Sequence, residues 1–316
     1  MRRSSTRPVR ATLVRVTTER VPPQAYFVTS AVFHYLGPAF AVLLFARVDV
    51  LGVAWLRIAS AAAVFLAWRR PWRVIASATW AQRRLLIAMG VVLGAMNVFF
   101  YLAIERLPLG TVGAIEFLGP ILLAALGART PRNTLALLGV IAGVVLLTDV
   151  RAEGDVLGYV FAIANALGFM LYAVLGHRLA ADGGASGIDR LGAAMVIALI
   201  AITPLGLSDA ARTVEQPLLL LAGIGVGICS SVIPYVCDQL AMARMPRATF
   251  ALMLALLPAT ATAIGVLVLR QVPSVIEIIG VVLVVAAIAI HRPADTRARP
   301  GRRRAQPRPP RIPSRR

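Results

Sequence analysis

The sequence predicts an all-α polytopic membrane protein with ten transmembrane helices, arranged as two inverted repeats of five helices each. Three observations predict this fold. Hydrophobic residues make up 59% of the 316 residues and charged residues 15%, whereas soluble domains usually contain about 25% charged residues. The apolar residues fall into ten stretches, most of which are long enough to span a membrane. A segment of the first half recurs in the second. The composition excludes a disordered chain, a disulfide scaffold and an ordinary soluble enzyme.

The ten apolar stretches are predicted to be helices because a helix satisfies its own backbone hydrogen bonds in lipid. The first stretch follows the Arg-rich residues 1–23 and is too long for the apolar region of a cleavable signal. Several later stretches are short or interrupted by Gly and Pro. The predicted spans cover residues 24–46, 50–68, 85–104, 109–128, 135–149, 156–176, 191–208, 217–242, 248–269 and 273–290.

The basic residues predict the orientation of the chain. All 33 of them are Arg, against 14 acidic residues, and the net charge is +19. With a cytoplasmic N-terminus, 27 arginines lie on the cytoplasmic side, 5 lie on the other side, and Arg57 lies within a span. This asymmetry is the positive-inside pattern. We therefore expect both termini to lie in the cytoplasm.

The two ends of the chain are basic. Residues 1–23 are rich in Arg, and residues 291–316 are rich in Pro and Arg, a composition typical of a disordered tail. Both segments are expected to adsorb to anionic lipid on the cytoplasmic side of the bilayer. Nucleic acid is not the expected partner, because the rest of the chain is strongly apolar.

An internal repeat relates the two halves. Residues 102–120 read LAIERLPLGTVGAIEFLGP and residues 240–258 read LAMARMPRATFALMLALLP, with seven identities that include Arg106 with Arg244 and Pro120 with Pro258. Five spans separate the copies, so the second copy enters the membrane in the opposite orientation, and the predicted repeats cover residues 24–149 and 156–290. Inverted repeats are typical of secondary transporters, whose substrate site lies at the repeat interface. The two prolines are expected to kink their helices beside that site.

Pairs of glycines four residues apart occur in three predicted spans. Such spacing places both glycines on one helix face and allows close helix packing. The pairs are Gly90 with Gly94, Gly139 with Gly143, and Gly223 with Gly227.

Ionisable side chains within predicted spans need an explanation, because each costs about 2.5–3.5 kcal/mol or more at the bilayer centre. Arg57 suits a clamp for a carboxylate or another anion. Glu116 or Asp238 suits a proton carrier or a group that binds an amine, and His34 could relay a proton. The structural alternatives are a permanent Arg57–Glu116 pair, an interfacial Asp238 and a packing role for His34. Glu277 lies near the outer end of its span, where a structural or hydrated carboxylate is expected.

Uncharged polar residues complete the set of candidates. Asn97, Asn165, Tyr172 and Tyr235 either line a cavity or form hydrogen bonds between helices. The sequence contains no G-x-x-x-x-G-K-[ST] nucleotide loop and no Cys/His metal motif. Cys229 and Cys237 are two helical turns apart, too far for a disulfide with each other. No cofactor is therefore expected.

Three runs resemble EamA-type members of the drug/metabolite transporter superfamily, and within it the bacterial threonine/homoserine exporter branch. They are GAMNVFFYLAIERLPLGTVGAIEFLGP (94–120), SSVIPYVCDQLAMARMPRATFALMLALLP (230–258) and WLRIASA (55–61). The most specific motifs are M-N-x-x-F-Y-L at Met96–Leu102, E-F-x-G-P at Glu116–Pro120 and a variant of L-P-x-x-T-F at Met245–Phe250. The resemblance covers about residues 24–291. It implies a protein of the bacterial inner membrane that exports amino acids or similar small metabolites in exchange for protons.

Carried over position by position, the resemblance implies polar site residues at Arg57, Asn97, Tyr101, Glu116, Tyr172, Tyr235 and Asp238. Asp238 stands where the branch usually has Glu. Leu257 stands where the family often has Glu, and Leu269–Gln271 replaces the usual L-G-E. A carboxylate that could carry protons or bind amines is missing at these positions, so substrate and coupling do not transfer directly.

These observations together predict a secondary transporter that exports small amino-acid-like molecules by alternating access, with protons as the coupling ion. They are compatible with a homodimer. Efflux of drugs or uptake of another metabolite remains an alternative. A membrane enzyme is a further alternative, but it would need catalytic groups clustered at one membrane face, whereas the polar groups here are dispersed over both halves.

Overall fold

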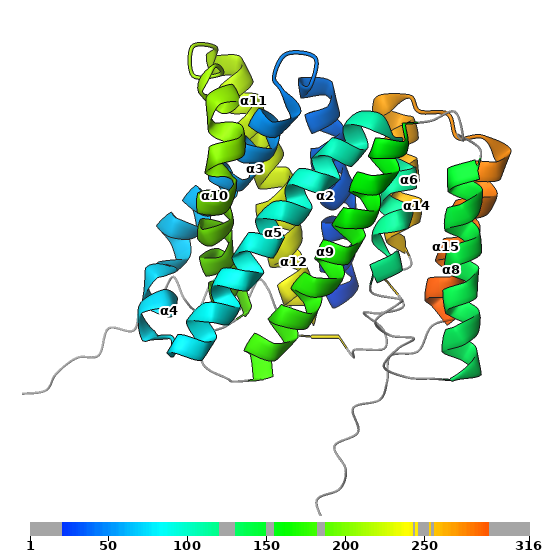
Figure 1. Ribbon diagram of the computed structural model, residues 1–316, viewed down its shortest axis with the longest axis horizontal. Coiled ribbons are helices and arrows are strands. Elements are labelled where there is room, and N and C mark those ends of the chain that lie inside the picture. The colour runs from blue at the N-terminus through cyan, green and yellow to red at the C-terminus, as the bar shows by residue number, and fades with distance from the viewer. Residues whose placement is uncertain are drawn as a thin grey trace, which may run out of the picture.

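The computed structural model describes residues 21–119, 130–149, 155–181, 187–242, 244–245, 253 and 256–290. Within these ranges the regular elements are all helices, and they form one bundle (Figure 1). The longer helices are α2 (Pro23–Leu44), α3 (Val50–Arg69), α5 (Trp80–Arg106), α8 (Pro131–Asp149), α9 (Val156–Ala181), α10 (Gly187–Ala211), α14 (Leu256–Leu269) and α15 (Val275–Ile290).

Every predicted span overlaps a helix of the described chain. Six helical segments there are long and apolar enough to cross a membrane: Pro23–Leu44, Val50–Arg69, Trp80–Arg106, Val156–Gly176, Gly187–Ala211 and Pro217–Ala241. Three apolar helices are shorter, and α6 (Leu109–Glu116) covers the beginning of the fourth predicted span. The all-helical architecture, with several helices long and apolar enough to span a membrane, is therefore confirmed within the described residues, while the number of ten spans and the orientation of the termini stay predictions.

The predicted boundaries are wrong at the third span. It begins at Trp80 rather than at residue 85, because Thr79 and Gln82 form a capping box that starts the helix before its apolar part. A short helix, α4 (Trp72–Ser77), fills the preceding connection. Hydrophobicity marks where a helix enters lipid, but the hydrogen bonds of its first turn decide where it begins.

The eighth predicted span is one stretch in the sequence but three elements in the structure. It comprises α11 (Pro217–Gly227), a π-helix η1 (Ile228–Val232) and α12 (Ile233–Met242), and the Ile233 N–H donates to the Ile228 carbonyl five residues back. Pro234 has no N–H, so the Ser230 carbonyl lacks the donor that an α-helix would supply. π-turns inside helices frequently mark functional sites.

The helices pack in a symmetric pattern. α3 packs against α10, α6 against α14 and α8 against α15. In the predicted repeat each of these pairs joins two equivalent helices. α5 also packs along α9, and α2 packs along α12. In the predicted repeat α5 is equivalent to α12 and α9 is equivalent to α2, so the symmetry of the repeat would exchange these two contacts. Two repeats related by a two-fold axis would produce this pattern, and the repeat boundaries at 24–149 and 156–290 stay a prediction.

The predicted close packing at the glycine pairs is confirmed. A Cβ added at Gly90 would lie 2.5 Å from the Ile197 side chain of α10, and one at Gly143 would lie 2.8 Å from the Gly280 carbonyl oxygen of α15. One added at Gly223 would lie 2.6 Å from the Leu56 side chain of α3. Each pair therefore lets a neighbouring helix approach its backbone.

Candidate functional site

A small cavity lies among α2, α3, α5, α6, α9 and α12. Its free volume is about 20 Å³, which is space for one water molecule. Apolar residues line part of it and polar or charged residues line the rest. The lining residues are His34, Arg57, Met96, Asn97, Phe100, Glu116, Asn165, Phe169 and Tyr235. Six of the candidate residues named from the sequence are thus brought together from helices in both halves of the chain: His34, Arg57, Asn97, Glu116, Asn165 and Tyr235.

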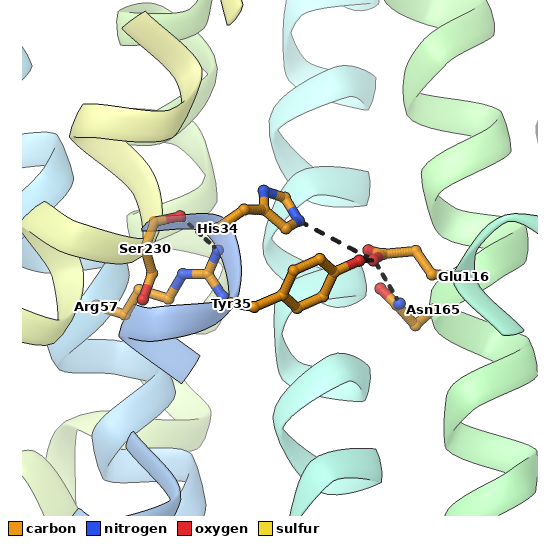
Figure 2. Close-up of polar contacts among 6 residues, drawn as sticks. All are labelled: His34, Tyr35, Arg57, Glu116, Asn165 and Ser230. Atoms are coloured by element: carbon orange, nitrogen blue, oxygen red, sulfur yellow. Dashed lines mark hydrogen bonds and ion pairs between the residues drawn. The ribbon is translucent and has the colours of Figure 1, made fainter. Parts of the chain in front are cut away.

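Glu116 is buried at the end of α6 and is held by side chains from two other helices (Figure 2). The Tyr35 hydroxyl donates to Oε2 at 3.4 Å, and Asn165 Nδ2 donates to Oε1 at 3.4 Å. His34 Nε2 lies 4.0 Å from Oε2. Both hydrogen bonds are longer than the usual distances. Loose bonds to neutral donors leave the carboxyl group free to exchange partners.

Arg57 is buried on α3 and is bound by the π-helix. Its Nε donates to Ser231 Oγ at 2.9 Å, and its Nη2 donates to the Ser230 carbonyl at 3.1 Å. The guanidinium carbon also lies 5.3 Å from the centre of the Tyr101 ring. The carbonyl that Pro234 leaves without a helical donor thus receives one from Arg57. A guanidinium has five N–H groups, so donors remain for a ligand in the cavity that Arg57 lines.

Arg57 and Glu116 line the same cavity without forming an ion pair with each other. Their hydrogen bonds go to η1 in one case and to α2 and α9 in the other. The alternative of a permanent Arg57–Glu116 pair is therefore not the arrangement of the described chain. Opposite charges held separately at one cavity can each bind part of a dipolar ligand.

The other predicted residues have varied positions. Asn97 is buried and donates to the Leu93 carbonyl of its own helix at 2.8 Å. Tyr101 lies under Arg57, and its hydroxyl has no hydrogen-bond partner within the described chain. Tyr172 packs beside Tyr235 in a common apolar cluster but is outside the cavity lining. Asp238 is half-buried, about one turn past Tyr235 on α12, and also outside the lining.

The predicted proline kinks are only partly covered by the structure. Pro258 is buried in the first turn of α14 as described, and Thr262 Oγ1 donates to its carbonyl at 3.0 Å. Pro120, like the basic segments 1–20 and 291–316, lies outside the described residues. The functional kinks therefore stay a prediction.

Two positions that lack the family's carboxylate, Leu257 and Gln271, and the carboxylate Glu277 each have a structural role. Gln271 accepts a hydrogen bond at 3.1 Å from the N–H of Leu109, the first residue of α6. Leu257 packs against the apolar cluster around Phe117. Glu277 is buried rather than hydrated, and it forms a capping box with Ser274 at the start of α15. The expectation of a structural role for Glu277 fits this geometry, and the expectation of a hydrated side chain is wrong.

The sequence analysis missed several side chains at the site. Tyr35 was not singled out because aromatic residues are common in apolar helices. Ser230 and Ser231 were missed because small hydroxyl residues also occur wherever helices pack closely. A usable signal was the run Ser230-Ser231-Val232-Ile233-Pro234, in which the proline leaves a carbonyl unpaired beside two hydroxyls.

Gly227 fixes the distance between η1 and Arg57. A Cβ at this position would lie 2.6 Å from the Arg57 carbonyl oxygen and closer still to Ser60 Oγ. We expect Gly227→Ala to destabilise the protein by about 1–3 kcal/mol through overpacking. Because 1 kcal/mol corresponds to about 2–4 °C in larger domains, the midpoint of thermal unfolding in detergent should fall by several degrees.

Gly225 provides the matched control for Gly227. It lies on the same helix, and an added Cβ there would have no neighbour within 4 Å. Gly225→Ala should leave the unfolding midpoint unchanged or raise it, because Ala favours helix more than Gly does. Equal midpoints for the two variants would contradict the close contact assigned to Gly227.

Among the residues whose placement is described, no group of three or more His, Cys, Asp or Glu side chains could hold a metal ion. The cavity itself is lined by amide, phenol, imidazole, carboxyl and guanidinium groups. These groups can bind a small polar molecule and can exchange protons.

Comparisons with known proteins identify the family. The sequence pattern of the EamA-like transporter family matches residues 156–291. The threonine/homoserine exporter RhtA of Escherichia coli (strain K12) is 31% identical over 255 residues, covering 79% of this chain and 84% of the exporter. RhtA of Salmonella typhimurium (strain LT2) is 30% identical over 254 residues, with the same coverage.

One solved crystal structure resembles the fold with a TM-score of 0.55 and 21% identity, covering 84% of this chain and 96% of that one. This likeness concerns the fold alone, whereas the sequence relationship to the exporters extends over most of both chains. The chain therefore belongs to the EamA-like transporters of the drug/metabolite transporter superfamily, in the threonine/homoserine exporter branch.

Proposed function

We propose that this transporter exports small amino-acid-like metabolites such as threonine or homoserine, in exchange for protons, by alternating access. One observation carries the proposal: one cavity is lined by both the Arg57 guanidinium and the Glu116 carboxyl group, which are not paired with each other. The names of the relatives, which are threonine/homoserine exporters, support the same substrate class.

The cavity is complementary to a zwitterion. A guanidinium binds a carboxylate through parallel N–H donors, so Arg57 suits the carboxylate of an amino acid. Glu116, with Asn165 beside it, suits the ammonium group. Asn97 could accept or donate a hydrogen bond to a side-chain hydroxyl, and Phe100 is among the residues that offer apolar contact.

Glu116 also suits the coupling step. It is buried, its two hydrogen bonds are long, and His34 lies 4.0 Å away. A carboxyl group in such surroundings can be neutral while the cavity is empty and charged while an ammonium group is bound. Protonation and substrate binding would then exclude each other, which is the requirement for exchange of one against the other.

The size of the cavity supports alternating access. A free volume of about 20 Å³ is space for a water molecule and not for an amino acid. Substrate entry therefore requires the surrounding helices to separate. The packing of α5 along α9 and of α2 along α12 supports two related arrangements that open to opposite sides. The proposed setting is a bacterial inner membrane with both termini cytoplasmic, as the distribution of arginines predicts.

An efflux assay tests the proposed substrate. Cells that overproduce the protein should release labelled threonine and homoserine several-fold faster than cells with an empty vector. Arg57→Gln should remove this gain, because it deletes the charge at the cavity. Arg212→Gln, at an arginine whose side chain is 75% exposed, should retain it.

The same assay distinguishes the alternatives. Overproduction that leaves threonine and homoserine efflux unchanged while it protects cells against toxic compounds would contradict the proposal in favour of drug efflux. Faster uptake of either amino acid, with no gain in release, would contradict the proposed direction of transport.

A further inference from the structure

Two arginines that match in the sequence repeat each contact an aromatic ring on a neighbouring helix. The guanidinium carbon of Arg106 lies 5.9 Å from the centre of the Phe161 ring, and that of Arg244 lies 5.4 Å from the centre of the Tyr26 ring. Both distances are within the range of about 6 Å over which a cation is attracted to a ring face. The repeat is thus reproduced in side-chain contacts as well as in sequence letters.

The two contacts lie at opposite ends of the bundle. Arg106 is the last residue of α5, and Phe161 is in the second turn of α9. Arg244 follows the end of α12, and Tyr26 is in the first turn of α2. The end of α5 lies at the top of the bundle in Figure 1 and the end of α12 lies at the bottom. Each contact therefore joins one of the helix pairs that pack along each other, α5 with α9 and α12 with α2.

The same four helices line the cavity. Asn97 on α5 and Tyr235 on α12 are lining residues, and each precedes the arginine that follows it by nine positions. At 1.5 Å per residue, nine positions along α5 correspond to about 13.5 Å, and Arg244 lies two residues beyond the end of α12. The two contacts are therefore placed on opposite sides of the cavity at similar distances from it.

The Arg106–Phe161 contact at the end of α5 is reinforced by an ion pair. Arg106 Nη1 donates to Asp155 Oδ2, while the N–H of Leu157 donates to Oδ1 at 3.0 Å and caps α9. The hydrogen bond from Arg106 lowers the pKa of Asp155, so the pair is ionised at neutral pH. A Cβ added at Gly158 would lie 2.9 Å from the Arg106 Cβ, which shows how closely the two helix ends approach.

We propose that Arg106–Phe161 and Arg244–Tyr26 are clamps that hold the two ends of the substrate pathway closed, and that transport opens them in alternation. The inference rests on the proposed alternating access but not on the identity of the substrate. Both clamps are formed here, and the cavity between them has space only for water. This combination is expected of an occluded state.

Access to the cavity from each side tests the clamps. Phe169→Cys at the cavity serves as the reporter, in a background with Cys229→Ala and Cys237→Ala, because these two cysteines are free thiols. The rate of labelling by a membrane-impermeant maleimide is measured in right-side-out and inside-out vesicles without any substrate. Phe161→Leu should raise the rate about three- to tenfold from one side only. Tyr26→Leu should raise it similarly from the opposite side.

Variants that keep the rings are the matched controls. Phe161→Tyr and Tyr26→Phe retain the cation–ring contact, so both labelling rates should stay near those of the parent. Equal increases from both sides, no increase in either Leu variant, or equal effects of the ring-keeping and ring-removing variants would overturn the clamps. A wrong substrate assignment would instead show in the efflux assay and leave these labelling rates unchanged.

Discussion

Glu116→Gln is expected to abolish proton-driven transport while leaving the protein folded. Glutamine keeps the size of the side chain and one acceptor oxygen, but its other terminal atom is an NH2 donor and it cannot bind and release a proton. Its oxygen can still accept from Tyr35, and its NH2 can donate to the Asn165 amide oxygen if that amide turns over, so both partners of Glu116 are retained. Unlike the loss of a packing residue, the change should therefore alter the coupling more than the stability.

The measurement uses purified protein in liposomes with an imposed pH gradient. A gradient of one pH unit amounts to about 1.4 kcal/mol per proton, or about tenfold accumulation of a substrate exchanged one for one. The parent should approach this accumulation with labelled threonine, and Glu116→Gln should show none. Exchange of labelled for unlabelled threonine without a gradient needs no net proton movement, so it should persist at threonine concentrations high enough to offset the weaker binding of the ammonium group by a neutral side chain.

Glu277→Gln is the matched control for the coupling residue. Glu277 is also a buried carboxyl group, but it belongs to the capping box of α15, and Gln can replace Glu in such a box. Its gradient-driven accumulation should equal that of the parent. Undiminished accumulation in Glu116→Gln would show that another group carries the proton.

The positions of the helices were predictable because the energetic requirement is local. Each apolar stretch must form its own backbone hydrogen bonds in lipid, so stretches such as 50–68 and 156–176 coincide closely with α3 and with the apolar part of α9, Val156–Gly176. The π-helix was not predictable in the same way. Its cause lies partly in the sequence, at Pro234, but its geometry also depends on Arg57 of another helix, which supplies a donor to the Ser230 carbonyl.

The charged members of the cavity were predictable for a related reason. A buried charge is costly in the membrane, so the few that remain, such as Arg57 and Glu116, are expected near each other and near a function. Neutral polar residues carry no such signal. Tyr35 and Ser231 contact the two charged side chains, yet tyrosine and serine occur elsewhere in the chain without any such role. Only their positions in space distinguish them.

Arg57→Lys is expected to weaken substrate binding strongly although it preserves the positive charge. The Arg57 guanidinium is held in place by two hydrogen bonds, from Nε to Ser231 and from Nη2 to the Ser230 carbonyl. A lysine ammonium is a single compact group and cannot bind both acceptors and also present parallel donors to a carboxylate. Because a hydrogen bond to a charged group contributes about 1.5–3 kcal/mol, KM for threonine should rise about 10- to 100-fold.

Arg69→Lys shows whether the effect is specific to the cavity. Arg69 also lies on α3, but it pairs with Asp189 at 2.7 Å, where its side chain is 31% exposed. This partly buried ion pair is outside the cavity lining, so Arg69→Lys should leave KM close to that of the parent. Thermal unfolding with and without threonine separates binding from folding, because Arg57→Lys should lose the stabilisation by threonine while keeping most of its own stability. A parent-like KM in Arg57→Lys would mean that the cavity uses Arg57 only for its charge, and that the fixed orientation supplied by η1 serves packing rather than recognition.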